Sequence, residues 1–185
     1  MSVEAISEQP TTVERTTHPP LSSSDLLGGD MRRSNPKDVV MTPTHIAVSI
    51  VNHFKPTGRI LEPCRGSGNI AKLMPGCEWC EITEGRDFFN WHEPVDWIVS
   101  NPPYSTFYDW MCHSFTLADD IVYLIPLHKL FSGSKYLKRI TEYGGIKEVM
   151  NMGSANIVGF PVGFAIGAVH FRRNYRGDTR IWTAA

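Results

Sequence analysis

The sequence predicts an α/β protein whose mostly parallel sheet is covered by helices on both faces. Segments with a strand pattern alternate with segments of helical periodicity, which is typical of such sheets. Several of the strand segments are short apolar runs that end abruptly at Gly or Pro turns. The chain has 185 residues, of which 42% are hydrophobic and 20% charged, enough for one domain with a packed core.

The first 30 residues differ in composition from the rest. They are rich in Ser, Thr, Glu and Pro, carry one basic and five acidic residues, and show no sustained strand or helix period. Such a segment cannot bury enough apolar area to offset its ordering entropy. We therefore expect a disordered acidic tail over 1–30 and a single folded domain over 31–185.

The first predicted helix begins near Thr42, which can cap it, with Pro43 at the first helical position. Apolar residues from Ile46 to Phe54 recur along one face for about three turns. Gly58 ends this helix. A buried strand over 59–63, a Gly-rich loop and a brief helix over 69–73 are expected to follow.

The rest of the chain continues the alternation. Further strands are predicted over 78–82, 96–100, 121–125, 146–150 and 164–171, and further helices over 107–117 and 134–142.

The loop from Glu62 to Asn69 lies where a doubly wound sheet places its ligand, after a strand and before a helix. Gly66 and Gly68 permit close backbone approach, although a tight turn without a ligand fits them equally well. Ala71 completes a loose G-x-G-x-x-A, so a dinucleotide must be considered. A carboxylate at Glu62 would repel a pyrophosphate but suits an ammonium or sulfonium cation, and S-adenosylmethionine carries both.

Two more acidic residues follow the second strand. Glu81 is placed to accept hydrogen bonds from ribose hydroxyls, and Asp87, followed by Phe88 and Phe89, to hold an adenine amine. Taken singly, each acid is equally well explained as a solvated loop residue.

The tetrad Asn101-Pro102-Pro103-Tyr104 comes directly after a buried strand. The two prolines fix φ and remove two donors, which holds the Pro102 carbonyl as an acceptor beside the Asn101 amide. Two acceptors facing an exocyclic amine direct its lone pair toward an electrophilic methyl group, and Tyr104 offers a face for a flipped base. Alone, the tetrad also fits a rigid strand-ending turn or a Pro-rich ligand.

Over about 41–171 the sequence resembles the class I S-adenosylmethionine-dependent amino-methyltransferases, in particular solitary DNA adenine-N6 methyltransferases of phages and prophages. The resemblance implies a Rossmann-like seven-stranded sheet with its last strand antiparallel. It assigns Asn101, Pro102, Pro103 and Tyr104 to catalysis, and Thr42, Pro43, Glu62, Pro63, Gly66, Gly68, Glu81, Asp87 and Asn101 to the cofactor.

The sequence departs from the family in two places. Only a short stretch separates Glu81 from Asp87, so the helix between those strands is expected to be shortened or lost. No separate target-recognition domain is expected after the sheet, so sequence reading would come from loops or from a second subunit, possible in a homodimer.

A basic group follows the predicted strand over 121–125, with no acid over 126–139, and consists of His128, Lys129, Lys135, Lys138 and Arg139. These side chains can neutralise phosphates, although a solvated helix face is an equally good interpretation. Phe160 is a candidate for the second face of a base sandwich and also fits a core residue.

The expected surroundings are those of a bacterial or phage-infected cytoplasm. The four cysteines form no disulfide framework, no signal peptide or membrane span is evident, and Cys77 and Cys80 have no second ligand pair for zinc. We therefore expect no metal.

The sequence thus favours methyl transfer from S-adenosylmethionine to adenine N6 in double-stranded DNA, with the base flipped out. Cytosine N4, RNA adenine and protein glutamine remain alternative acceptors. A non-catalytic cofactor-binding module and a dinucleotide-dependent oxidoreductase are the alternatives from other classes.

Overall fold

The computed structural model describes residues 40–156, 158–160 and 163–184, so the predicted tail lies outside the described residues. The strands are β1 (Ile60–Glu62), β2 (Glu78–Trp79), β3 (Val95–Ser100), β4 (Ala118–Pro126), β5 (Gly144–Ser154), β6 (Ala165–Arg173) and β7 (Arg180–Thr183). The α-helices are α1 (Thr44–Phe54), α2 (Phe107–Leu117) and α3 (Ser134–Tyr143). Short 3-10 turns complete the description: η2 (Ala71–Leu73), η3 (Ile82–Glu84), η4 (Phe88–Asn90) and η5 (Leu127–Phe131).

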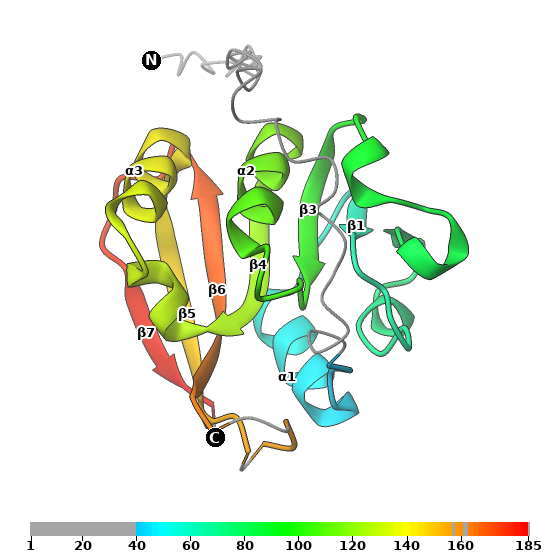
Figure 1. Cartoon of the computed structure of the whole chain (residues 1–185), viewed down its shortest axis with the longest axis horizontal. Coiled ribbons are helices and arrows are strands. Elements are labelled where there is room, and N and C mark those ends of the chain that lie inside the picture. Colours follow the sequence, from blue (N-terminus) through cyan, green and yellow to red (C-terminus); the bar gives the residue numbers. More distant parts are fainter. Residues whose placement is uncertain (1–39, 157, 161–162, 185) are drawn as a thin grey trace, which may run out of the picture.

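The strands form one seven-stranded sheet in the order β2-β1-β3-β4-β6-β5-β7 (Figure 1). The prediction of a mostly parallel α/β sheet is confirmed. The strand predicted last, over 164–171, is β6, and it runs antiparallel to both of its neighbours as expected. The chain reverses after β5 to place β6 beside β4, and then crosses β5 so that β7 pairs parallel with its outer edge.

Helices cover both faces of the sheet because successive side chains of each strand point to opposite sides. On one face, Leu61 and Ile98 join the core beneath α2 and α3. On the other, their neighbours Ile60 and Val99 pack with the apolar stripe of α1. The carboxyl ends of β1 and β3 therefore open between α1 and α2, toward the lower part of Figure 1.

The boundaries of several elements differ from those predicted. The helix over 107–117 is confirmed, but 69–73 contains only the single 3-10 turn η2, and the strand predicted over 78–82 has two residues. Thr42 is not the cap of the first helix, because α1 begins at Thr44 with Pro43 at its N-cap. Thr42 is buried instead, and its carbonyl oxygen accepts a hydrogen bond from Asn69 Nδ2 (2.8 Å).

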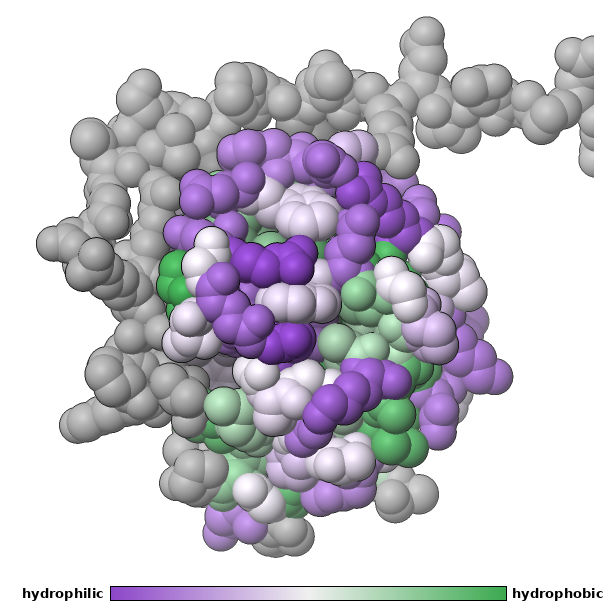
Figure 2. All heavy atoms as spheres, turned by 90° about the vertical axis from the view of Figure 1, so that its right-hand side faces the viewer, coloured by the Kyte–Doolittle hydropathy of each residue, from purple (hydrophilic) through white to green (hydrophobic). Residues whose placement is uncertain are grey.

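The expected loss of the helix between Glu81 and Asp87 is confirmed. The 3-10 turn η3 lies between these residues, and an isolated antiparallel bridge joins Glu81 to Arg86. Seen from the side of β1 and β2, hydrophilic side chains form much of the surface, with hydrophobic ones in smaller patches (Figure 2). Charged side chains at a sheet edge discourage pairing with other chains.

β7 was not among the predicted strands. All four of its residues are exposed, so the segment lacks the buried alternation that identifies a strand in sequence.

Among the described residues, no helix is both long enough and apolar enough to cross a membrane.

The connections at the two ends of α3 give a test of the fold. Gly144 and Gly133 flank α3 with similar extended φ angles, 168° and 167°. A Cβ on Gly144 would lie 2.1 Å from the Arg172 carbonyl oxygen, whereas one on Gly133 would meet nothing within 4 Å. Gly144→Ala should therefore lower the free energy of unfolding by about 1–3 kcal/mol in urea titrations.

Gly133→Ala is the matched control and should change stability by less than about 0.5 kcal/mol. Equal losses for both variants would contradict the close approach of the α3–β5 connection to β6.

Candidate active site

A cleft of about 720 Å³ lies at the carboxyl edge of β1 and β3. It brings together residues that are far apart in sequence, from Val40 to Trp110. The predicted site residues that line it are Thr42, Glu62, Pro63, Gly66, Glu81, Asp87, Asn101 and Pro103. Four other predicted residues, Pro43, Gly68, Pro102 and Tyr104, are not among its lining.

Glu62 ends β1 and is 1% exposed. Its Oε2 accepts a hydrogen bond from the Ala71 backbone N–H (2.7 Å), the one backbone donor that stabilises its charge. Burial raises the pKa of Glu62 to about 8, even though Ala71 and the nearby Arg65 lower it. The cleft thus holds a carboxyl group that would ionise most readily beside a bound cation.

Glu81 connects the Gly-rich loop to the turn after β2. One carboxylate oxygen accepts from the Gly66 N–H (2.8 Å) and the other from the Thr83 hydroxyl (2.8 Å). Burial raises the pKa of Glu81, but these hydrogen bonds and Arg65 outweigh it, so the pKa lies below its ordinary value. Glu81 is therefore ionised and retains lone pairs for a ligand's hydroxyl groups.

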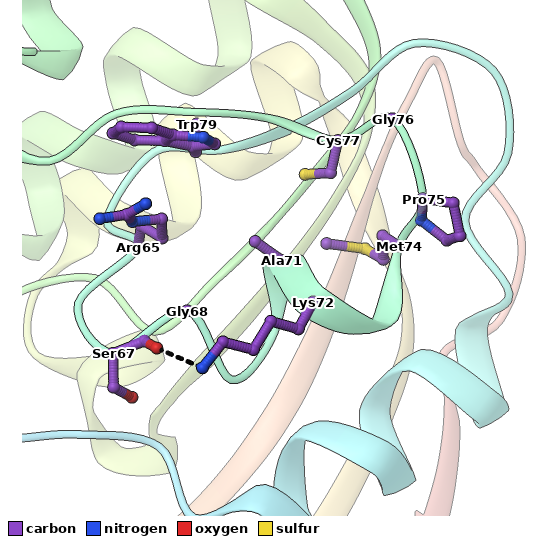
Figure 3. Close-up of a pocket in the computed structure, with 10 residues that line it drawn as sticks. All are labelled: Arg65, Ser67, Gly68, Ala71, Lys72, Met74, Pro75, Gly76, Cys77 and Trp79. Carbon is purple, nitrogen blue, oxygen red and sulfur yellow. Dashed lines mark hydrogen bonds between the residues drawn. The ribbon is translucent and has the colours of Figure 1, made fainter.

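The outer side of the Gly-rich loop borders a second cavity of about 390 Å³, shown in Figure 3. Lys72 points back to the loop, and its Nζ donates to the Ser67 carbonyl oxygen (2.9 Å). Gly68 lines this cavity rather than the cleft and has a φ of 76°. Gly68 therefore shapes the loop, because few other residues adopt that conformation without strain.

Trp79 fixes the cationic side chains beside the cleft. The Arg65 guanidinium lies 3.8 Å from the centre of the Trp79 ring (Figure 3), and that of Arg86 lies 3.9 Å from it. Two groups so close to one ring centre must occupy its opposite faces. This cation–π sandwich ties the Gly-rich loop to the segment that leads into Asp87.

Asp87 caps η4 by accepting a hydrogen bond from the Phe89 N–H (3.0 Å). Beside it, Phe88 stacks on Trp110 of α2 with ring centres 4.9 Å apart. The exposed apolar side chain of Ile82 lines the same cleft. This end of the cleft combines an apolar lining with the Asp87 carboxylate, which suits a planar ring carrying an amine.

Cys64 also lines the cleft. Burial raises its pKa to about 12, and the nearby charges of Glu81 and Glu62 raise it further. The thiol stays protonated at neutral pH, which disfavours nucleophilic catalysis by this residue.

Asn101 stands at the end of β3, on the opposite wall of the cleft from the loop. Its Nδ2 donates to the Val40 carbonyl oxygen (3.1 Å), which fixes the orientation of the side-chain amide. The Asn101 Oδ1 is buried and has no hydrogen-bond partner among the described residues. A buried acceptor without a donor is costly, so this oxygen is suited to receive a ligand's N–H.

Tyr104 belongs to the tetrad but packs away from the cleft lining. Its ring meets Phe164 edge to face, with centres 6.2 Å apart, and Phe164 in turn meets His128 at 5.7 Å. Phe160 is 3% exposed and packs in the core on the α1 side, so its interpretation as a core residue is confirmed and the base-sandwich alternative is wrong. Phe164 is the aromatic side chain that the fold places beside Tyr104.

The predicted basic group is divided between two elements. His128 and Lys129 lie on η5, directly after β4, whereas Lys135, Lys138 and Arg139 lie on α3. Arg139 pairs with Glu142 (3.6 Å), and Lys135 Nζ lies 4.2 Å from the centre of the Tyr108 ring.

The residues that line the cleft without having been predicted as site residues include Asn69, Thr83 and Trp110. Asn69 and Thr83 act through hydrogen bonds to Thr42 and Glu81, partners that become neighbours only in the folded chain. Trp110 lies on the helix that follows the tetrad, and this position was the only sequence feature that could have indicated a role in the cleft. A large apolar residue there is equally typical of the core.

No protein-family model and no curated protein matches the chain. Solved structures are similar to it in fold. A provisionally assigned class I S-adenosylmethionine-dependent methyltransferase from Listeria monocytogenes has a TM-score of 0.58 at 12% identity, over 83% of this chain and 68% of that one. A type I restriction-modification methyltransferase subunit from Streptococcus thermophilus has 0.56 at 14% identity, over 78% and 47%.

A dimethyladenosine transferase from Plasmodium falciparum is also similar, with a TM-score of 0.51 at 14% identity over 72% of this chain and 62% of that one. The chain spans about half the length of the restriction-modification subunit. At these identities the likeness establishes the fold: this is the Rossmann-like fold of class I methyltransferases.

The burial of Glu62 makes stability depend on pH in a defined direction. Between its ordinary pKa of 4.5 and the folded value of about 8, Glu62 is protonated when folded and ionised when unfolded. Stability contributed by this group therefore falls as pH rises through that window. Relative to wild type, Glu62→Gln should gain on the order of a few kcal/mol between pH 4 and pH 9, measured by urea unfolding.

The wild-type and Glu62→Gln curves should run parallel at lower pH, where Glu62 is protonated in both states. Parallel curves across the whole range would show that Glu62 is not buried as described.

Proposed function

We propose that the protein transfers a methyl group from S-adenosylmethionine to the exocyclic N6 amine of adenine in DNA. One observation carries the proposal: one cleft is lined by three carboxyl groups suited to a cationic nucleoside, Glu62, Glu81 and Asp87, and by the unpaired Asn101 amide oxygen, suited to an amine. The fold, which is that of class I methyltransferases, supports the same conclusion.

The residues of the cleft fit the parts of this cofactor. Glu62 would hold the ammonium group, because a cation restores the charge that burial suppresses. Glu81 would accept from the ribose hydroxyls, and Asp87 from the adenine amine beside Ile82. When bound, S-adenosylmethionine supplies an electrophilic methyl group on a sulfonium sulfur.

Asn101 would act on the acceptor. Its Oδ1 would accept one N–H of the amine, which draws the nitrogen lone pair out of conjugation with the ring. The acceptor nitrogen forms the new bond to the methyl carbon as the methyl–sulfur bond breaks, and the nitrogen then loses a proton to water. Positioning and electrostatics supply the catalysis, so no strong base is required.

Three features support a flipped base in DNA as the acceptor. The tetrad resembles that of DNA adenine-N6 methyltransferases. Similar structures include a restriction-modification methyltransferase subunit and a dimethyladenosine transferase. Tyr104 of the same tetrad pairs its aromatic ring with that of Phe164, and the basic group on η5 and α3 follows the adjacent strand.

Asn101→Ala tests the proposed role of the amide. We expect kcat to fall at least about 100-fold, because the acceptor loses the hydrogen bond that activates it, while affinity for S-adenosylhomocysteine stays within about threefold. Labelled S-adenosylmethionine, unmethylated DNA and mass spectrometry of the digested nucleosides give the measurement. Asn52→Ala, an exposed change on α1, is the matched control.

N6-methyladenine that disappears with Asn101→Ala would support both the reaction and the acceptor. Label found only in RNA, in cytosine or in added protein would overturn the DNA adenine assignment. Equal losses of turnover and cofactor affinity would overturn the role given to Asn101.

The pKa of Glu62 predicts the pH dependence of cofactor binding. At pH 7 the Glu62 carboxyl group of the ligand-free protein is protonated, and a bound ammonium favours the carboxylate, so binding should release about one proton. The affinity for S-adenosylhomocysteine should rise about tenfold from pH 6 to pH 7. Calorimetry in two buffers of different ionisation enthalpy measures the proton directly.

Glu62→Gln should bind more weakly and release no proton. Proton release that persists in Glu62→Gln would assign it to another group.

A further inference from the structure

A row of aromatic side chains leads from the tetrad to the outer surface. Tyr104 contacts Phe164, and Phe164 contacts His128 at the start of η5. Residues three apart in a 3-10 turn lie one above the other, so Phe131 follows His128 on the same side of η5. Tyr104 and Phe164 are half-buried, His128 is exposed, and Phe131 is 71% exposed.

The fold holds Phe131 outward on a firm support. Leu130 beside it is 3% exposed, and Leu127 lies against Gly167 of β6, where an added Cβ would meet its Cδ2 at 2.8 Å. The Ser132 hydroxyl donates to the His128 carbonyl oxygen (3.1 Å), which closes the end of the turn. An aromatic ring so exposed on an anchored turn is suited to stacking on a partner.

Charge around the turn favours an anionic partner. The sequence has no acidic residue from Leu127 to Thr141, across η5 and most of α3. Lys129, two residues before Phe131, and Lys138 form no ion pair within the part of the chain that the structure describes. Aromatic rings that alternate with cations are typical of surfaces that bind unpaired nucleotides.

We propose that the row Tyr104, Phe164, His128 and Phe131 is a track for a nucleic-acid strand, with Phe131 stacked on an unpaired base next to the one presented to Asn101. The inference rests on the proposed function and adds a second point of contact. It explains how a turn outside the cleft takes part in substrate binding: Lys129 meets the phosphates and Phe131 a neighbouring base.

Fluorescence anisotropy with a labelled single-stranded DNA oligonucleotide, in the presence of S-adenosylhomocysteine, tests the track. Phe131→Ala should weaken binding about tenfold, and Phe131→Trp should restore it, because any large aromatic ring can stack. Leu137→Ala is the matched control, an apolar side chain of α3 that is 42% exposed. Leu137→Ala should leave oligonucleotide binding unchanged. None of the three variants should change the affinity for S-adenosylhomocysteine alone.

An abasic site at each neighbour of the target adenine locates the contact. When the abasic site is at the position that Phe131 contacts, Phe131→Ala should cause no further loss of oligonucleotide affinity. Such non-additivity in a double-mutant cycle indicates that the side chain and the base interact directly. Binding and methylation by Phe131→Ala equal to wild type would overturn the track and leave the proposed function standing. The track would also be overturned if Phe131→Ala changed the oligomeric state measured by light scattering but left the affinity for the oligonucleotide unchanged.

A wild-type protein that binds no oligonucleotide but methylates a peptide would overturn the nucleic-acid acceptor and the track together. That result is distinct, because it appears in the wild type before any substitution is compared.

Discussion

A single buried carboxylate, Glu62, joins the parts of the molecule that form the cleft. Its backbone carbonyl accepts from the Cys80 N–H after β2 (3.0 Å), and its side chain accepts from the Ala71 N–H at η2 (2.7 Å). Burial raises its pKa to about 8, so the fold carries a group that costs stability whenever it is ionised without a cation beside it. A cost of this kind is typical of functional sites, where a ligand supplies the missing charge.

The remaining features of the cleft depend on how firmly its two walls are held. On the cofactor side, Glu81 bonds to Gly66, and the Arg65–Trp79–Arg86 sandwich holds the loop from outside. On the acceptor side, Asn101 is oriented by the Val40 carbonyl oxygen. Both walls follow adjacent parallel strands, β1 and β3, so one sheet edge sets the distance between a cationic methyl donor and an amine.

Sequence patterns predicted the parts of the fold that local chemistry determines. The helix over 107–117 and the buried strands β3 and β4 have strong periodicity or continuous apolar runs, and the Gly-rich loop and the tetrad have distinctive turn residues. The exposed strand β7 at the sheet edge and the partnership of Tyr104 with Phe164 depend on how distant segments pack. Such packing leaves no pattern in a single stretch of sequence.

A crystal structure with S-adenosylhomocysteine is the most direct test of the claim that one cleft serves both donor and acceptor. We predict the ligand's ammonium at Glu62, its ribose hydroxyls at Glu81, and its sulfur on the side of the cleft that faces Asn101. A ligand bound in the reverse orientation, or in the smaller cavity beside Lys72, would contradict it.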